Sequence, residues 1–358
     1  MRGGGMTSTD RPRRSGGRFR AFTRLRGWGG VSAMGAACVV TAALTLLPLL
    51  HTSREAVEQA EQSAGSLATA VPAKADECVN PEASLPPSGA DGPTIAKIKA
   101  RGRLWVGVDQ NSYQWGYRDP ASPNGSIEGF DIDLAHAIAA DILGDPNKIT
   151  FRAIPTNLRV QALQNGSVDI VVRTMTINCE RKKQVAFSTA YFQAGQQVLA
   201  PKSDPSIKGY DASLAGKRVC TAQGSTAYDQ LVKKSYGAIF KDPHDGTARD
   251  EDQLTVPNQL DCLVRLQLGE VDAVVTDNAL AAGQVAQDPA VQLRGKPFTT
   301  EYYGVAVKLG NDDLVRRVNQ VLVGYRAGGT ASPWMVSYRH WLKAGLPGIT
   351  GPPAAKYE

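Results

Sequence analysis

Two oppositely charged side chains stand just beyond apolar runs and have the chemistry to bind a small zwitterion. Arg181 follows Thr176 in "TMTINCERKK", where the free N–H groups of a helix start and a guanidinium fork together suit a carboxylate. Asp277 ends the run "AVVTD" and can accept from an ammonium group. Such a ligand leaves water only if both charges are paired, so the combination predicts a free amino acid. Taken singly, Arg181 is also typical of a solvated helix face, and Asp277 of a helix N-cap.

An internal duplication places these two side chains at corresponding points of the chain. Residues 163–172, "LQNGSVDIVV", align with residues 266–275, "LQLGEVDAVV", with seven of ten positions identical. Each copy reads as the end of a helix, a break at Gly166 or Gly269, and then a continuous apolar strand. Glycine suits the break because helix ends often need a left-handed residue. A chance coincidence of two helix–glycine–strand units is the alternative.

The continuous apolar strands predict parallel sheets covered on both faces, and therefore an α/β fold. Strand-like openers precede the two copies at residues 102–108 and 216–222, so we expect two α/β lobes of similar build. In open α/β sheets, ligands bind beyond the carboxyl ends of the strands. Two facing lobes would form one cleft, to which residues 222–229 add the N–H-rich helix start around Ser225 and Thr226.

The basic character of the chain resides in its N-terminal tail. Residues 1–26 contain eight Arg and one Asp, a net +7, against +6 for the whole chain and therefore −1 for residues 27–358. Binding of nucleic acid by the body of the chain therefore loses its electrostatic support.

An uncharged stretch at residues 27–50 is long enough to cross a bilayer as a helix. Its Arg-rich flank predicts an N-terminus in the cytoplasm and a body anchored at the outer face of the cytoplasmic membrane. A cleaved signal peptide and a lipoprotein that uses Cys38 are the alternatives. Residues 51–92 are rich in Ala, Glu, Gln, Ser and Pro and predict a stalk or linker. The folded body is expected from near Thr94 to about Leu346.

The other four cysteines, Cys78, Cys179, Cys220 and Cys262, lie in the part predicted to be exported, where disulfides persist. Their even number predicts two disulfides in any of three pairings. No two of them have C-x-x-C spacing and the chain has four His, so a zinc site is not expected. We expect no other cofactor either.

From about residue 95 to residue 345 the chain resembles the type 2 periplasmic binding proteins of polar amino acid ABC transporters. Within that family it is most similar to the glutamate- and aspartate-binding members, especially the actinobacterial glutamate-binding type. The resemblance rests on the order and spacing of the motifs "GRLWVGVD", "IEGFDIDLAHAIA", "VQALQNGSVDIVV", "TMTINCERKKQVAFSTAYF", "LAGKRVCTAQGSTAYD", "EVDAVVTD" and "YYGVAVKLGNDDLVRRVNQVL".

The resemblance implies how the two ends of an amino acid would be held. Arg181 would bind the ligand α-carboxylate, together with the backbone N–H groups of Thr176 and Thr226. Asp277 would accept from the α-ammonium, with the Thr176 hydroxyl and the Thr174 carbonyl completing its contacts.

The resemblance also implies an acidic ligand. Thr156 and Arg159 match positions that members selective for acidic side chains use for the distal carboxylate, and Arg173 is a second candidate. An arginine there favours glutamate or aspartate over glutamine, because a buried guanidinium without an anion is costly. A surface position for Arg159 is the alternative. Tyr113 and Trp115 lie where the family places an aromatic wall over the ligand's methylenes, although this loop lacks the common Pro-Phe pattern.

The implied architecture is a pair of Rossmann-like lobes joined by a two-crossing hinge, near residues 193–197 and 297–302. Lobe 1 would comprise residues 95–194 and 300–345, and lobe 2 residues 198–296. Hinge closure around the ligand is the expected motion.

Within this architecture we expect Cys220 to pair with Cys262 inside lobe 2. Cys78 would pair with Cys179 and tie the stalk to lobe 1. Neither disulfide would then block closure.

We therefore expect a non-enzymatic protein that captures an acidic amino acid outside the membrane and delivers it to an ABC permease. A membrane-anchored sensor that signals to a membrane partner is the first alternative. The second is an enzyme like the cyclohexadienyl dehydratases, which is disfavoured because no catalytic domain is added and no His or acidic pair stands beside the predicted pocket.

Overall fold

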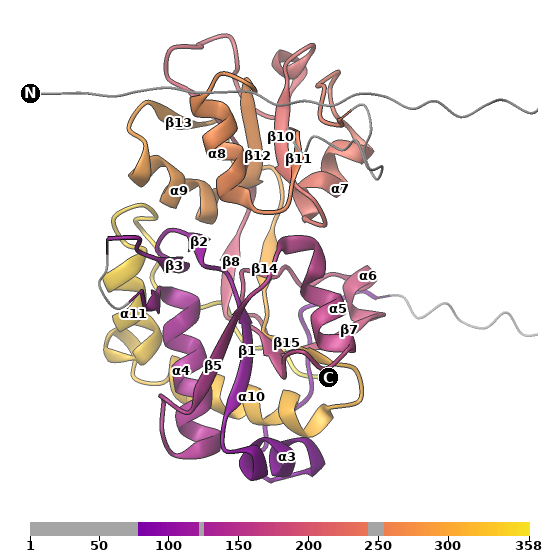
Figure 1. The fold of residues 1–358 in the computed structure, drawn as a ribbon, viewed down its shortest axis with the longest axis vertical. Coiled ribbons are helices and arrows are strands. Elements are labelled where there is room, and N and C mark those ends of the chain that lie inside the picture. The colour runs from indigo at the N-terminus through magenta and orange to yellow at the C-terminus, as the bar shows by residue number, and fades with distance from the viewer. Residues whose placement is uncertain (1–77, 122–124, 243–253) are drawn as a thin grey trace, which may run out of the picture. The chain divides into compact units, whose positions relative to one another are not determined.

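The computed structural model describes residues 78–121, 125–242 and 254–358, which form two α/β lobes, each built on a five-stranded sheet (Figure 1). The tail and membrane segment expected at residues 1–50, and the part of the expected stalk before Cys78, lie outside the described residues. Among the residues that are described, no helix combines the length and apolar character that a membrane span requires.

The sheet of lobe 1 has the strand order β5-β1-β6-β15-β7. β1 pairs in parallel with β5 and β6, whereas β15 pairs antiparallel with β6 and β7. The strands are β1 (Leu104–Val108), β5 (Ile149–Ala153), β6 (Ile170–Val171), β7 (Val185–Phe187) and β15 (Ala306–Lys308).

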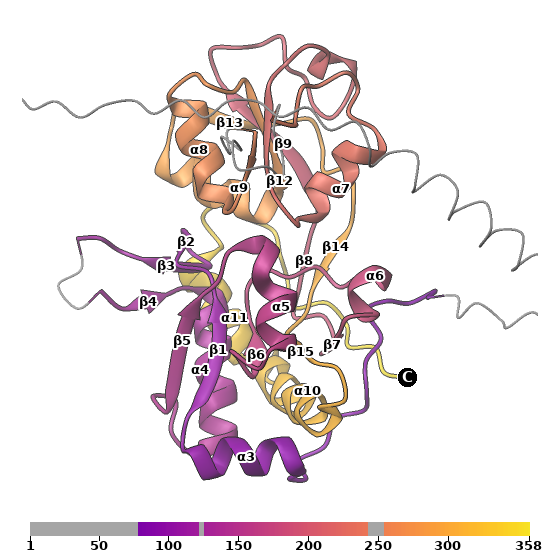
Figure 2. The ribbon, with the colours of Figure 1, turned by 45° about the vertical axis from the view of Figure 1, so that its right-hand side comes forward.

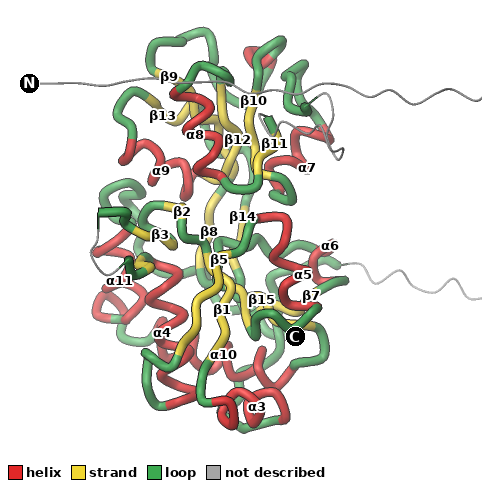
Figure 3. Tube along the Cα trace, in the orientation of Figure 1, coloured by secondary structure: helices red, strands yellow, loops and turns green. Residues whose placement is uncertain are grey.

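Helices and a small ribbon surround this sheet (Figure 3). One hydrophobic cluster joins it to α3, α4, α10 and α11, and a second joins it to α5. The helices are α3 (Pro93–Arg101), α4 (Phe130–Leu143), η1 (Thr156–Leu158), α5 (Arg159–Gln164), α6 (Cys179–Lys182), α10 (Asp312–Arg326), η3 (Gly329–Ala331) and α11 (Pro333–Trp341). The ribbon strands are β2 (Asn111–Ser112), β3 (Gly116–Arg118) and β4 (Ile127–Glu128).

The sheet of lobe 2 has the order β11-β10-β12-β9-β13, with β10 parallel to its two neighbours and β9 antiparallel to both of its own. Its strands are β9 (Gln196–Pro201), β10 (Val219–Ala222), β11 (Thr255–Val256), β12 (Ala273–Asp277) and β13 (Val291–Arg294). Separate hydrophobic clusters join it to α8 and α9, and to α7 and η2. These helices are η2 (Ala212–Leu214), α7 (Thr226–Lys233), α8 (Gln259–Gln267) and α9 (Asn278–Gln287).

The chain crosses between the lobes twice, and an antiparallel pair of short strands accompanies the crossings (Figure 2). β8 (Phe192–Ala194) continues through Gly195 into β9 of lobe 2, and β14 (Glu301–Tyr303) brings the chain back toward β15 of lobe 1. The two-lobed type 2 architecture predicted from the sequence is therefore confirmed.

The duplicated motif forms the same local structure in each lobe. Gly166 and Gly269 both adopt left-handed φ values, +74° and +72°, immediately after α5 and α8. The aspartate three residues later then accepts from the backbone of a neighbouring strand opener. Asp169 Oδ2 accepts from the Trp105 N–H and Asp272 Oδ2 from the Arg218 N–H, both at 2.8 Å.

The described part of the expected stalk packs onto lobe 1. Ser84 is buried, its backbone pairs with the C-terminal segment through Lys356 O (3.1 Å) and the Glu358 N–H (3.0 Å), and its hydroxyl donates to Phe187 O at 2.6 Å. A body from Thr94 to Leu346 is therefore too narrow a prediction, because these flanking segments satisfy their backbone groups against each other.

Both expected disulfides are present. Cys78 pairs with Cys179 at a Cα–Cα distance of 5.8 Å, and Cys220 with Cys262 at 5.5 Å. The first joins the segment before α3 to the start of α6, and the second joins β10 to α8.

Candidate functional site

A small cavity of about 10 Å³ lies where the two lobes meet, beyond the carboxyl ends of β6 and β12. Seven of the predicted residues line it, from both lobes. The lining residues are Arg159, Thr174, Thr176, Arg181, Ser225, Thr226, Ala227, Gln259, Thr276 and Asp277.

Arg181 presents its guanidinium to this cavity from the short helix α6. Asn178 caps that helix by accepting from the Arg181 N–H at 2.8 Å. The guanidinium donates to Thr176 O at 2.7 Å and to Gly224 O of lobe 2 at 3.1 Å. Burial lowers the pKa of Arg181, while Asp277 and other carboxylates nearby oppose that shift. A cation held by carbonyl oxygens alone retains donors for an anionic group.

Asp277 faces the cavity from the end of β12, where it also precedes α9. The Tyr303 hydroxyl donates to its Oδ2 at 2.5 Å. Burial and the nearby Glu301 raise the pKa of Asp277 to about 7, against the opposing effects of Tyr303 and the guanidiniums of Arg181 and Arg159. This carboxyl group is therefore poised to ionise when a cation reaches it.

Thr174 is held in a rare conformation at the cavity wall, with φ +40°. Its N–H donates to Asp131 Oδ2 at 2.9 Å and to the Tyr191 hydroxyl oxygen at 3.2 Å, while that hydroxyl donates to Asp131 Oδ1 at 2.8 Å. Burial raises the pKa of Asp131 to about 7. A left-handed threonine is costly, so this buried network is what keeps the backbone at Thr174 in place.

Lobe 2 contributes the turn before α7. The Ser225 hydroxyl caps the helix by accepting from the Tyr228 N–H at 3.1 Å, and the Thr226 hydroxyl donates to Glu301 Oε2 at 3.1 Å. The turn also carries Gly224, at φ +71°, whose carbonyl oxygen accepts from the guanidiniums of both Arg181 and Arg159.

Arg159 is only 4% exposed and lines the cavity, so it does not lie on the helix surface. Its guanidinium donates to Thr156 O at 2.8 Å, to Gly224 O at 3.3 Å and to Arg173 O at 3.4 Å. Burial, with Arg181 and Arg173 nearby, places its pKa well below the ordinary value. Among the described residues, neither Arg159 nor Arg181 forms an ion pair.

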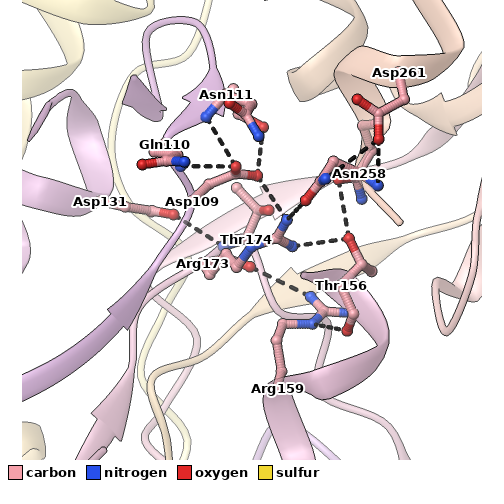
Figure 4. Close-up of polar contacts among 12 residues, drawn as sticks. Asp109, Gln110, Asn111, Asp131, Thr156, Arg159, Arg173, Thr174, Asn258 and Asp261 are labelled. Carbon is pink, nitrogen blue, oxygen red and sulfur yellow. Dashed lines mark hydrogen bonds and ion pairs between the residues drawn. The ribbon is translucent and has the colours of Figure 1, made fainter. Parts of the chain in front are cut away.

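Thr156 and Arg173 do not line the cavity, contrary to their expected role at the distal carboxylate. Arg173 forms an ion pair with Asp109 at 2.9 Å and donates to the Thr156 hydroxyl oxygen at 3.0 Å (Figure 4). That hydroxyl in turn donates to Gln259 Oε1 of lobe 2 at 3.2 Å. Partners within the protein therefore engage the Thr156 hydroxyl and both terminal nitrogens of the Arg173 guanidinium.

The expected aromatic wall is also corrected. Trp115 has no exposed surface and packs edge-to-face on Phe130 and Phe192 in the core of lobe 1, while its indole N–H donates to Ala279 O at 3.0 Å. Tyr113 is 37% exposed and lies against Tyr117. Neither ring lines the cavity. A large ring whose one donor finds a carbonyl is stabilised by full burial, which explains why Trp115 turns inward.

The lobes touch each other around the cavity. The Thr156 N–H donates to Pro257 O at 3.1 Å, and the Asn157 side-chain amide donates to Gln223 Oε1 at 2.8 Å. With the arginine contacts to Gly224, these bonds bring the lobe 1 and lobe 2 walls together.

This geometry agrees with the comparisons with known proteins. Residues 104–343 match the family described as bacterial extracellular solute-binding proteins, family 3. The chain belongs to this family.

Relatives of this solute-binding protein bind several amino acids. The ABC transporter glutamine-binding protein GlnH of Bacillus subtilis is 37% identical over 250 residues, covering 70% of this chain and 85% of GlnH. The glutamate-binding protein GluB of Corynebacterium glutamicum is 29% identical, covering 68% and 80%. A solved structure of an ancestral arginine-binding protein bound to glutamine is 37% identical with a TM-score of 0.57, covering 68% of this chain and 98% of that one.

Three lining residues of this solute-binding protein were not predicted: Ala227, Gln259 and Thr276. The place of Thr276 at the cavity could have been predicted from the sequence. It lies between the duplicated motif and Asp277, and it corresponds to Arg173 in the first copy. No sequence pattern indicates the role of Gln259, the first residue of α8. Only the approach of lobe 2 to Thr156 brings its side chain to the cavity.

Proposed function

We propose that this solute-binding protein captures an acidic amino acid, glutamate before aspartate, and delivers it to the permease of an ABC importer. The observation that carries the proposal is the pair of buried guanidiniums at Arg159 and Arg181, which both line the cavity, while Asp277 is the single lining carboxylate among the described residues. With all three ionised, the lining carries one net positive charge. An acidic amino acid carries the complementary single negative charge at neutral pH.

Each charge of glutamate has a partner in this arrangement. Arg181 would bind the α-carboxylate, with the N–H groups of Thr176 and Thr226. Asp277 would pair with the α-ammonium, with the Thr174 carbonyl beside it. Arg159 would hold the distal carboxylate, because a guanidinium forms two parallel bonds with a carboxylate but not with a carboxamide.

Glutamine is the second candidate, because relatives 37% and 38% identical are glutamine-binding proteins. The two candidates differ in the cost of burying Arg159. A neutral carboxamide would leave this cation without an anion, and a site built for a charged partner penalises the analogue that lacks it.

Calorimetry of the chain against the twenty amino acids separates these candidates. We expect glutamate to bind at least about tenfold more tightly than glutamine, roughly the 1.4 kcal/mol that one charge-assisted bond supplies over a neutral one. A clear preference for glutamine would overturn the acidic assignment and leave the family function intact.

We further propose that residues 27–50 anchor the protein at the outer face of the cytoplasmic membrane. Their support is the uncharged apolar composition behind an Arg-rich flank. Fractionation of cells should place the protein in the membrane pellet, released by detergent and not by high salt. Recovery in the soluble fraction would contradict the anchor.

A further inference from the structure

Arg173 and Asp109 form a buried ion pair next to the ligand cavity. Asp109 follows β1 and Arg173 lies just beyond β6, and these two strands are parallel neighbours, so their carboxyl ends place both side chains together. The guanidinium Nη2 lies 2.9 Å from Asp109 Oδ2, and the two side chains are 0% and 5% exposed. Figure 4 shows the pair between the Gln110–Asn111 turn and the network around Thr156.

Asp109 is fully engaged by this pair and its own turn. Its Oδ1 accepts from the N–H groups of Gln110 and Asn111 at 2.8 and 3.0 Å, and its Oδ2 accepts from the Ser112 hydroxyl at 2.8 Å as well as from Arg173. Burying a carboxylate is costly unless its charge is balanced nearby. Arg173 supplies that balance.

Arg173 also contacts residues that line two separate pockets. It lines neither, but its carbonyl oxygen accepts from Arg159 of the ligand cavity, and its guanidinium reaches Asp109 and Asn258. Asp109 and Asn258 line a second pocket of about 210 Å³. Its other lining residues are Gln110, Asn111, Ala153, Ile154 and Pro155. Arg173 therefore bonds to a lining residue of the ligand cavity, Arg159, and to two lining residues of the neighbouring pocket, Asp109 and Asn258.

We propose that Arg173 is a specificity-determining residue, which neutralises Asp109 and so keeps the net positive charge of the ligand cavity. This inference rests on the acidic preference proposed above. Without Arg173, the Asp109 carboxylate would face Arg159 uncompensated and would add one negative charge beside the cavity. An anionic side chain would then lose its electrostatic advantage, while neutral and cationic side chains would gain, because charges in a low-dielectric site act over several ångströms.

A charge cycle at the two positions tests this role. The chain and its variants Arg173→Met, Asp109→Asn and the double variant are titrated by calorimetry with glutamate, glutamine and arginine. We expect Arg173→Met to lower the affinity ratio of glutamate to glutamine by roughly tenfold or more, and to raise arginine binding. Asp109→Asn should raise the same ratio, and the double variant should return it to within about threefold of the original.

An unchanged ratio in Arg173→Met would overturn the proposal. Removing one member of a buried pair can prevent folding, so thermal unfolding is measured for every variant. If Arg173→Met does not fold, Asp109→Asn and the double variant decide, and an unchanged ratio in Asp109→Asn overturns the proposal equally. As a matched control, Arg218→Met removes a guanidinium from the Arg218–Asp272 pair of lobe 2, away from the cavity, and must leave the ratio as it was.

The two proposals fail separately in this experiment. The acidic preference is read from the unmodified chain, whereas the role of Arg173 is read from the change between variants. A chain that prefers glutamine, with a ratio that still falls in Arg173→Met, would sink the first and uphold the second.

Discussion

Gly283 of α9 faces Tyr113 of lobe 1 so closely that a Cβ built at Gly283 would lie 2.7 Å from the Tyr113 carbonyl oxygen. Two lobes can approach this closely only where a side chain is missing. The contact belongs to the arrangement in which the lobes touch around the cavity, so it offers a way to disturb closure without touching a ligand contact.

Gly283→Ala should weaken amino acid binding by roughly tenfold while leaving the free energy of unfolding unchanged or higher. Gly283 has no positive φ, and alanine is favoured over glycine inside a helix by about 1 kcal/mol. The added methyl group therefore penalises only the closed lobes. Calorimetry and thermal unfolding measure the two effects. Gly324→Ala in α10 is the control, because nothing lies within 4 Å of its Cβ position, and it should gain stability without losing affinity. Equal affinities in both variants would refute this role for the Gly283 contact.

Arg181→Ala and Asp277→Ala should each reduce ligand affinity by about thirtyfold or more. Each leaves one ligand charge buried without its partner, a loss on the order of 2–5 kcal/mol. Calorimetry measures the affinity, and circular dichroism checks that the fold remains. Arg218→Ala, in the half-exposed pair with Asp272, is the matched control and should bind normally. Retained affinity in either cavity variant would remove that residue from the site.

Ligand affinity should rise with pH between about 5.5 and 8. Burial and Glu301 raise the pKa of Asp277 to about 7, so part of this group is protonated near neutrality. An ammonium group favours the ionised carboxylate, so binding releases a proton, and each pH unit below 7 should cost up to about tenfold in affinity. Calorimetry in buffers of different ionisation enthalpy counts that proton. Uptake of a proton on binding would show the opposite sign and contradict the role of Asp277.

The contribution of Asp131 to the pH dependence of affinity must be distinguished from that of Asp277, because burial raises the pKa of Asp131 to about 7 as well. Its protonation would loosen the N–H of Thr174 and act in the same direction. Asp131→Asn is the test, and it should lower affinity at every pH while preserving the slope that Asp277 causes. A slope that disappears in Asp131→Asn would assign the pH dependence to Asp131 instead.

Mild reduction of the folded protein should open Cys78–Cys179 and leave Cys220–Cys262 intact. Cys78 is exposed, whereas Cys220 and Cys262 have no exposed surface. A thiol reagent reaches a disulfide only through solvent, so access decides the order. Alkylation followed by peptide mass mapping identifies the opened pair. The Cys78→Ser/Cys179→Ser variant should lose on the order of 2–4 kcal/mol of stability. Earlier alkylation of Cys262 would contradict this order.

Local patterns explain how far the fold and the site could be predicted from the sequence. The helix–glycine–strand units at residues 163–172 and 266–275 depend on neighbours in the chain, because glycine ends the helix and an apolar run enters the sheet. Strand polarity then places the residues just after each unit at one edge of its sheet. For this reason the sequence alone could assign Arg181 and Asp277 to one cavity. The same patterns predicted the two-lobed fold.

Contacts across the cleft decided the rest, because they depend on segments far apart in the chain. Arg173 and Arg159 both lie near a strand end. Arg173 forms an ion pair with Asp109, whereas Arg159 lines the cavity. Trp115 is buried because a backbone carbonyl of α9 accepts a hydrogen bond from its indole N–H. Gln259 lines the cavity because lobe 2 contacts Thr156 there. The sequence alone determined which charges stand at the strand ends. The tertiary structure decided which of them remain unpaired, since pairing requires partners that only folding and closure bring within reach.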